Sequence, residues 1–285
     1  IADGDWSSDV CSSDLVARDV GADRVCWNKD YSGLARERDA AVRRALDGVD
    51  VARESVHDHL HHEPGSITTN KGEPYSVYTY FWKKWRDREK AERYAEPSSD
   101  RLADPGGVDD TGTLPSIEAL GFEEPIATVP DAGTEPARER LARFRDDGIF
   151  RYDSDRDYPT RDAVSRLSTD LKWGTLGVRE VYAATEAAMD AAGEDERESV
   201  EEFQSQLAWR EFYTHVLFFN PEVVSQNFKE YENDIEWRDD EEELAAWRAG
   251  ETGYPIVDAG MRQLKAEESA PVARGMNGRP SSSGG

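Results

Sequence analysis

The sequence predicts a fold of the class α/β plus all-α, in which a Rossmann-like parallel sheet precedes a helical region. Short apolar segments at residues 24–27 and 49–52 flank a helical pattern at residues 33–46, which is the element order of a parallel sheet. Proline, glycine and acidic residues are enriched in residues 96–135, and helical spacing of apolar residues then continues to residue 265. This change in composition separates two domains.

Five parts of the chain follow from these patterns. The two end segments show neither alternation nor a helical period, so we expect them to be foreign to the folded domains. Thr134 is predicted to cap the first helix of the second domain, with Pro136 in its first turn. The five parts are the leader 1–14, the α/β domain 15–95, the interdomain linker 96–135, the helical domain 136–265 and the tail 266–285.

The composition is that of a soluble globular protein. Hydrophobic residues make up 37% of the 285 positions, which is enough for the cores of two domains. We find no run of 18 apolar residues and no signal peptide, so we expect a cytoplasmic protein with no membrane partner. Cys11 and Cys26 have no metal-ligand spacing and cannot form a disulfide framework, a pattern typical of a reducing compartment.

Acidic residues outnumber basic ones by 60 to 35, which gives a formal net charge of −25. A field of this sign opposes the approach of nucleic acid at ordinary salt. Either the partner is not a nucleic acid, or the protein works at high ionic strength, where the Debye length falls to about 3 Å at 1 M salt. Because the acidic residues are spread over every segment, we favour a salt-adapted, halophilic protein.

Four histidines crowd one short segment: His57, His59, His61 and His62. A metal site is one interpretation of this cluster. A four-coordinate site needs further ligands, and the chain offers neither a second histidine cluster nor a cysteine pair to complete it. We therefore predict no metal.

The pattern at residues 200–219 predicts one long buried helix, with Ser199 and Glu202 as a capping box and Pro221 preventing its continuation. Three residues at spacings of three and four share one face of this helix: Gln206, Trp209 and Arg210. One interpretation is ordinary core packing with an internal hydrogen bond. The other is a site for an aromatic ligand that carries a phosphate, since an aromatic ring, a guanidinium and an amide suit such a molecule.

Hydroxyl side chains flank residues 166–167 immediately before a predicted helix. Ser165 and Ser168, together with free backbone N–H groups, are suited to holding a pyrophosphate, although a serine at a helix start is also an ordinary N-cap. Neither glycine-rich nucleotide-binding loop occurs in the chain, so such a ligand must be held in another way.

Several long stretches closely resemble the photolyase and cryptochrome family. The central one reads Gln-Leu-Ala-Trp-Arg-Glu-Phe-Tyr at residues 206–213, and the resemblance covers roughly residues 15–265. The other stretches are 73–85, Tyr152 with Arg156, 164–168 with 171–176, 234–237 and 246–264. The resemblance implies an α/β antenna domain without its start and a helical FAD-binding domain without its end.

The resemblance also implies which residues bind FAD. A phosphate loop and the residues packed around it would contact the cofactor, although the family often has threonine at position 164, where this chain has valine. The implied FAD-binding residues are Tyr152, Val164, Ser165, Arg166, Leu167, Ser168, Phe203 and Arg210. A second antenna chromophore, a folate or a deazaflavin, is compatible with the same resemblance.

A second implied set contacts a pyrimidine pair flipped out of DNA: Arg156, Gln206, Trp209 and Tyr213. Many relatives have glutamate where Gln206 stands, and an amide donates a hydrogen bond but cannot exchange a proton with the lesion. Trp237 corresponds to the surface end of the family's electron-transferring tryptophan chain, or it anchors a loop as a half-buried side chain.

The implied function is that of a class I-like DNA photolyase resembling halophilic archaeal members. Such an enzyme splits cyclobutane pyrimidine dimers in damaged DNA by electron transfer from excited reduced FAD, and we expect it to be a monomer. The alternatives are a cryptochrome-type blue-light photoreceptor and a non-catalytic remnant. We expect the chain as given, an incomplete fragment of the family, to be inactive by itself.

Overall fold

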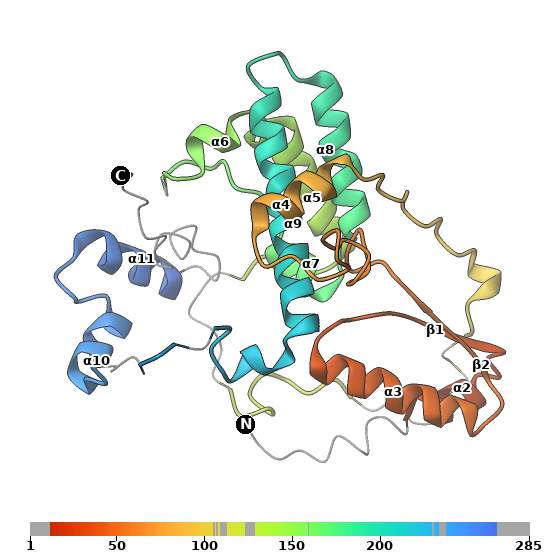
Figure 1. The fold of residues 1–285 in the computed structure, drawn as a ribbon. Helices are drawn as coiled ribbons and strands as arrows, with labels where there is room; N and C mark the ends of the chain where they lie inside the picture. The colour runs from red at the N-terminus through yellow and green to blue at the C-terminus, as the bar shows by residue number, and fades with distance from the viewer. Residues whose placement is uncertain are drawn as a thin grey trace. The chain divides into compact units, whose positions relative to one another are not determined.

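The computed structural model describes residues 12–104, 106, 108, 113–122, 129–158, 160–229, 231–233 and 238–266. These residues form two compact units, and each is described by itself (Figure 1). The first unit contains the described residues up to Thr113, with residues 177–183 and 204–229. The second contains the described residues of 114–176, 184–203 and from 230 onward. Helices α8 (Val178–Ala191) and α9 (Arg197–Phe219) contribute residues to both units.

A parallel pair of strands opens the first unit. Strand β1 (Arg24–Asn28) pairs with β2 (Ala52–Val56) in a register that places Arg24 opposite Ala52. Helix α3 (Gly33–Asp47) connects them, and the Ser32 hydroxyl caps it by accepting a hydrogen bond from the amide of Ala35 at 3.3 Å. The βαβ order predicted from the sequence is confirmed (Figure 1).

The predicted position of the second strand, residues 49–52, is wrong. After α3 ends, the amides of Val49 and Val51 still donate to the carbonyl of Leu46, at 3.1 and 3.4 Å. Asp50 lies in the left-handed region with φ of 58°. This turn occupies the apolar residues that suggested a strand, so β2 begins only at Ala52.

Helix α4 (Tyr78–Asp87) is anchored in the first unit by Phe81 and Trp85, which are buried. Its ring contacts include Phe81 with Phe212 of α9, at 5.4 Å between centroids. Lys90 lies just after the end of α4, and its ammonium donates to the carbonyls of Arg86 and Arg88, at 3.1 and 2.8 Å. The remaining elements of this unit are α2 (Ser12–Asp19) and two 3₁₀ turns, η1 (Ser99–Arg101) and η4 (Pro221–Val224).

Helices make up the regular structure described in the second unit, as the sequence predicts. Besides parts of α8 and α9, these elements are α5 (Thr134–Asp146), η3 (Gly148–Arg151), α6 (Tyr152–Asp155), α7 (Ser168–Trp173), α10 (Glu241–Ala249) and α11 (Pro255–Ala266). Pro136 lies in the first turn of α5, as predicted. The N-cap of α5 is Gly133, with φ of 111°, so the prediction of Thr134 as the cap is wrong by one residue.

The predicted capping box at Ser199 is also wrong. Helix α9 begins at Arg197, so Ser199 lies inside its first turns and is only 1% exposed. Its hydroxyl donates to the carbonyl of Ile149 at 2.7 Å and accepts from the amide of Asp153 at 3.2 Å. A long-range contact therefore uses the side chain that the local pattern assigned to a cap.

Among the described residues, no helix is both long enough and apolar enough to cross a membrane. The predicted domain boundaries stay predictions. The two compact units are defined by contacts in space, and each combines separate parts of the sequence, so their limits are not domain boundaries along the chain.

Candidate functional site

The candidate residues are distributed over both compact units. The second unit contains Tyr152, Arg156, the segment 164–168 and Phe203. The first contains Gln206, Trp209, Arg210 and Tyr213, all on α9. Trp237 lies outside the described residues.

Tyr152 and Phe203 are brought together in the core of the second unit. Their ring centroids are 5.3 Å apart in an edge-to-face arrangement, and Phe144 contacts Phe203 at 4.6 Å. Tyr152 is 2% exposed and Phe203 is 5% exposed. Both rings therefore belong to the hydrophobic core of this unit.

The 164–168 segment turns sharply before α7. Arg166 has a φ of 53°, and Leu167, the N-cap residue of α7, has φ of −92° and ψ of 6°. Alternation of left- and right-handed residues directs successive N–H groups toward one side, which is the geometry of an anion-binding nest. Leu167 is buried and fixes the turn, and Ser168 is exposed.

The serines of the segment do not cap α7. No side chain caps α7, so Ser168 is not the ordinary N-cap of the alternative interpretation, and the Ser165 hydroxyl accepts a long bond of 3.5 Å from the Leu167 amide. The first turn of α7 contains Asp170, whose carboxylate is held by two hydrogen bonds from Arg140, at 3.1 and 2.7 Å. With that charge balanced, the donor set of N–H groups and hydroxyls fits the phosphates of FAD.

Arg156 is occupied within the second unit. Its guanidinium pairs with the carboxylate of Glu202 and lies 5.5 Å from the centre of the Tyr152 ring. Both members of the ion pair are partly exposed, so an incoming phosphate can compete with Glu202 for the guanidinium.

Trp209 lies in a cluster of stacked rings, which we call the stacked cluster: Tyr78, Trp209 and Tyr213. Tyr78 and Trp209 are nearly parallel, with centroids 3.5 Å apart and an interplanar angle of 10°. Tyr213 stacks on Trp209 at 5.4 Å and 25°, and it is 62% exposed. The Tyr78 hydroxyl donates to the carbonyl of Ser205 at 2.7 Å, which locks its ring in place. The sequence analysis missed Tyr78, because no local pattern connects it with a residue 131 positions later.

Gln206 and Arg210 make different contacts on the same helix. The Gln206 amide donates to the Ser205 hydroxyl at 3.2 Å. The Arg210 guanidinium donates to the carbonyl of His59 at 2.7 Å and lies 3.1 and 3.2 Å from the ring nitrogens of the same histidine. The role of Arg210 as a flavin phosphate partner stays a prediction.

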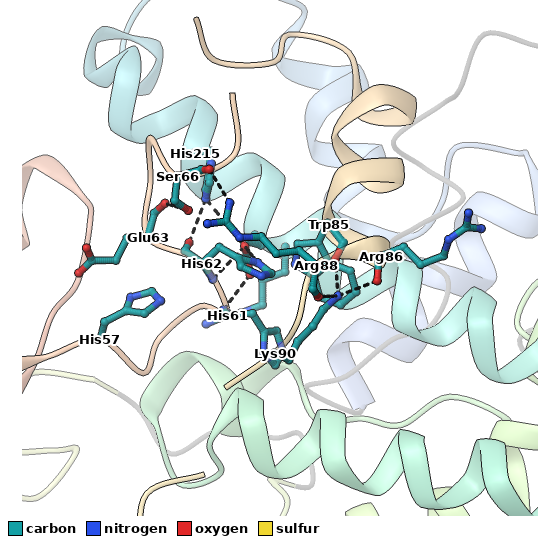
Figure 2. Close-up of polar contacts among 12 residues, drawn as sticks. His57, His61, His62, Glu63, Ser66, Trp85, Arg86, Arg88, Lys90 and His215 are labelled. Atoms are coloured by element: carbon teal, nitrogen blue, oxygen red, sulfur yellow. Dashed lines mark hydrogen bonds and ion pairs between the residues drawn. The ribbon is translucent and has the colours of Figure 1, made fainter. Parts of the chain in front are cut away.

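Two of the other histidines, His61 and His62, contact the buried carboxylate of Glu211, and Figure 2 shows both of them together with His215. Glu211 accepts hydrogen bonds from the amides of His61 and His62, at 2.8 and 3.1 Å, and contacts the His62 ring at 3.0 Å. His215 contacts the His62 carbonyl at 3.1 Å. Burial opposes ionisation of Glu211, but the hydrogen bond and the charge of the His62 ring hold its pKa below the ordinary value.

The same burial lowers the pKa of His61 to about 3, which keeps its ring neutral. The described residues contain no group of three or more side chains suited to hold a metal ion. His61, His62 and His215 therefore form an internal network with Glu211, a residue that the sequence analysis had not singled out.

Comparison with known proteins agrees with this architecture. Residues 13–99 match the DNA photolyase family, and residues 203–270 match the FAD binding domain of DNA photolyase. Together the two matches cover more than half of the chain. A deoxyribodipyrimidine photo-lyase of Halobacterium salinarum is 60% identical over 254 residues, which are 88% of this chain and 53% of that protein.

Solved structures have the same fold. A class III photolyase from Agrobacterium tumefaciens has a TM-score of 0.76 and 30% identity, over 95% of this chain and 56% of that one. A cryptochrome from Synechocystis has the same TM-score at 18% identity, over 90% of this chain and 54% of its own, which shows the fold alone.

The fold and the matched regions define a flavoprotein class with an α/β domain and a helical FAD-binding domain. Within that class, the chain belongs to the DNA photolyase family. It spans about half the length of the curated photo-lyases that it matches, with 53% of the Halobacterium protein covered. The Halobacterium match also agrees with the salt-adapted composition.

Proposed function

We propose that this chain is part of an enzyme that repairs cyclobutane pyrimidine dimers in DNA under light. The main evidence for this proposal is the 60% identity to a deoxyribodipyrimidine photo-lyase across 88% of the chain. The stacked cluster supports the proposal, because it presents aromatic surface beside an amide donor on one helix. A flipped pyrimidine pair offers ring faces and carbonyl edges that suit these groups.

FAD would be held on one side by the 164–168 segment, whose N–H groups and hydroxyls suit its phosphates. Tyr152 and Phe203 would support that segment by their packing, and Arg210 would add a cation. When bound and reduced, FAD supplies the photoexcited electron donor. The residues of this chain would position the cofactor.

The lesion would be held by residues that do not exchange protons. Trp209 and Tyr213 would stack on the flipped bases, and the Gln206 amide would donate a hydrogen bond to a pyrimidine carbonyl. Arg156 would contact a DNA phosphate after it leaves Glu202. Trp237 would serve as one member of an electron-transferring chain of tryptophans.

Further properties of the whole enzyme belong to the same proposal. It would act as a cytoplasmic monomer on damaged DNA, with a folate or a deazaflavin as a second chromophore. If the protein is a cryptochrome, it should bind flavin but repair no DNA. If it is a non-catalytic remnant, it should bind no flavin.

A chimera tests the proposal, with residues 15–265 of this chain replacing the matching region of the Halobacterium photo-lyase. We expect the chimera to bind FAD and to split dimers in a duplex under blue light but not in the dark. Trp209→Ala should lower repair while FAD content stays constant. A chimera that binds FAD and repairs no dimers would favour a photoreceptor, and one that binds no FAD would favour a remnant.

A further inference from the structure

Lysines are concentrated in one short stretch of this acidic chain. Residues 71–90 contain four of the eight lysines and six basic residues against three acidic ones, although the whole chain has a net charge of −25. The stretch begins within a turn at residues 69–73 and includes helix α4. Local charge of this sign, inside a field of the opposite sign, indicates an anionic ligand.

An open pocket of about 540 Å³ lies between this turn and α4. Its lining residues are Thr69, Asn70, Lys71, Glu73, Tyr75 and Lys84. We call it the lysine pocket. It belongs to the first unit and contains none of the candidate residues described above.

The turn that forms one wall of the lysine pocket is fixed by its own hydrogen bonds. The Thr69 hydroxyl accepts from the amides of Lys71 and Glu73, at 3.3 and 3.2 Å. The Thr69 amide donates to the Glu73 carbonyl at 2.8 Å, and Gly72 supplies the required positive φ of 81°. The other wall is α4, anchored by Phe81 and Trp85. Both walls are therefore organised before a ligand arrives.

The two lysines of the pocket keep their charges unpaired. Across the described part of the chain, the ammonium groups of Lys71 and Lys84 meet no hydrogen-bond acceptor and no carboxylate partner. Lys29, in contrast, pairs with Glu63 at 2.7 Å. Glu73 is the one acidic residue among those lining the pocket, which leaves it with a net charge of +1.

We propose that the lysine pocket binds a phosphate of the DNA backbone next to the lesion. This inference rests on the proposed function. It is supported by α4 itself, which contributes Lys84 to the pocket and Tyr78 to the stacked cluster around Trp209. Lys71 and Lys84 are exposed, and an open, exposed pocket suits a polymer that passes along the surface. The lysines thus attract phosphate at short range against the net charge of the chain.

Matched double variants test the proposal in the 285-residue chain. Lys71→Gln with Lys84→Gln removes the two pocket charges. Arg24→Gln with Lys29→Gln removes two charges that are paired with Glu54 and Glu63, so the net charge changes equally. Binding of a labelled, undamaged oligothymidylate is followed by fluorescence anisotropy over a range of potassium chloride concentrations.

The pocket variant should weaken binding and flatten the plot of log affinity against log salt by about 0.7, since one phosphate contact on a single strand contributes about that much. The control variant should leave that slope unchanged. Glu73→Gln should act in the opposite direction and strengthen binding. Equal effects of the pocket and control variants would overturn the proposal.

A second probe separates DNA from small phosphorylated molecules. Pyrophosphate is titrated while the amide NMR signals of residues 69–73 are recorded. We expect oligothymidylate to shift these signals and pyrophosphate to compete with it. Shifts with pyrophosphate alone would overturn the assignment to DNA. Because the oligonucleotide carries no dimer, failure here leaves light-driven repair untouched, and failure of repair in the chimera leaves this binding result intact.

Discussion

Each compact unit keeps a carboxylate buried near its share of the candidate site, and the two carboxylates have different partners. In the second unit, Asp170 in the first turn of α7 is paired with Arg140 at 2.7 Å. In the first unit, Glu211 beside Arg210 is surrounded by backbone amides and histidines. An arginine stays charged at every ordinary pH, whereas a histidine changes its charge in the physiological range. The two parts of the site should therefore respond differently to mutation and to acid.

The largest expected effect is the loss of the Asp170 pair. Asp170→Ala leaves the guanidinium of Arg140 buried without its partner, since these side chains are only 4% and 11% exposed. We expect the free energy of unfolding to fall by about 3–5 kcal/mol, measured by urea denaturation. Asp153→Ala, at an exposed position of the same unit, is the comparison and should change it by less than about 0.5 kcal/mol. Similar small losses in both variants would contradict the pairing.

Acid tests the first unit. The folded-state pKa of His61, about 3, lies below its unfolded value near 6.5, so the unfolded chain binds the proton first as the pH falls. The contribution of His61 to the free energy of unfolding is fully present above pH 6.5. It is lost progressively toward pH 3, by at most about 1.4 kcal/mol per pH unit. His57, His215 and Glu211 have lowered pKa values and act in the same direction.

The groups that face His61 are Glu211, His62, Lys90 and Arg179. Urea denaturation between pH 7.5 and 5, at high salt to screen the net charge, measures the loss. His61→Gln should flatten the profile. A free energy of unfolding that rises on acidification would contradict the lowered pKa of His61.

A smaller effect is expected at the stacked cluster. Tyr78→Phe keeps the ring on Trp209 but removes the hydrogen bond to the Ser205 carbonyl, so we expect a loss of about 0.5–1.5 kcal/mol. Tyr78→Leu should add the loss of stacking, about another 0.5–1.5 kcal/mol, and should change the near-ultraviolet circular dichroism of Trp209. Tyr80→Leu, on the exposed side of α4, serves as the control. An unchanged spectrum in Tyr78→Leu would remove Tyr78 from the cluster.

The smallest effect concerns the backbone of the 164–168 segment. Arg166 holds a positive φ that favours glycine, so Arg166→Gly should stabilise the chain by about 0.5–1 kcal/mol. Arg161→Gly offers a comparison at a residue without positive φ and should not stabilise. Thermal unfolding distinguishes the two, and destabilisation by Arg166→Gly would mean that the arginine side chain matters more than its backbone.

These contrasts also show what the sequence could and could not predict. Patterns within about ten residues were sufficient for α3 and the order of its parallel strands, for Pro136 in α5, and for the helix α7 that follows residues 166–167. These patterns failed where a side chain contacts a residue that is distant in the sequence. Ser199 bonds to Ile149 instead of capping its helix, and Tyr78 reaches Trp209 across 131 positions.

The histidine segment illustrates the same limit. Its density suggested a metal site, and the argument against a metal rested on missing ligands. What the histidines contact, the carboxylate of Glu211, lies about 150 positions away and carries no local signal. Buried polar partners at such separations are set by tertiary packing, which periodicity does not encode.

The two-stranded sheet has a consequence for self-association. Among the described residues its only strands are β1 and β2, so each presents one edge with unused backbone donors and acceptors. Arg24, Arg53 and Glu54 place charges along these strands, a feature that discourages pairing between copies of a chain. Screening by concentrated salt weakens that protection. High ionic strength therefore favours contact between exposed strand edges, and the usable protein concentration should fall as salt rises.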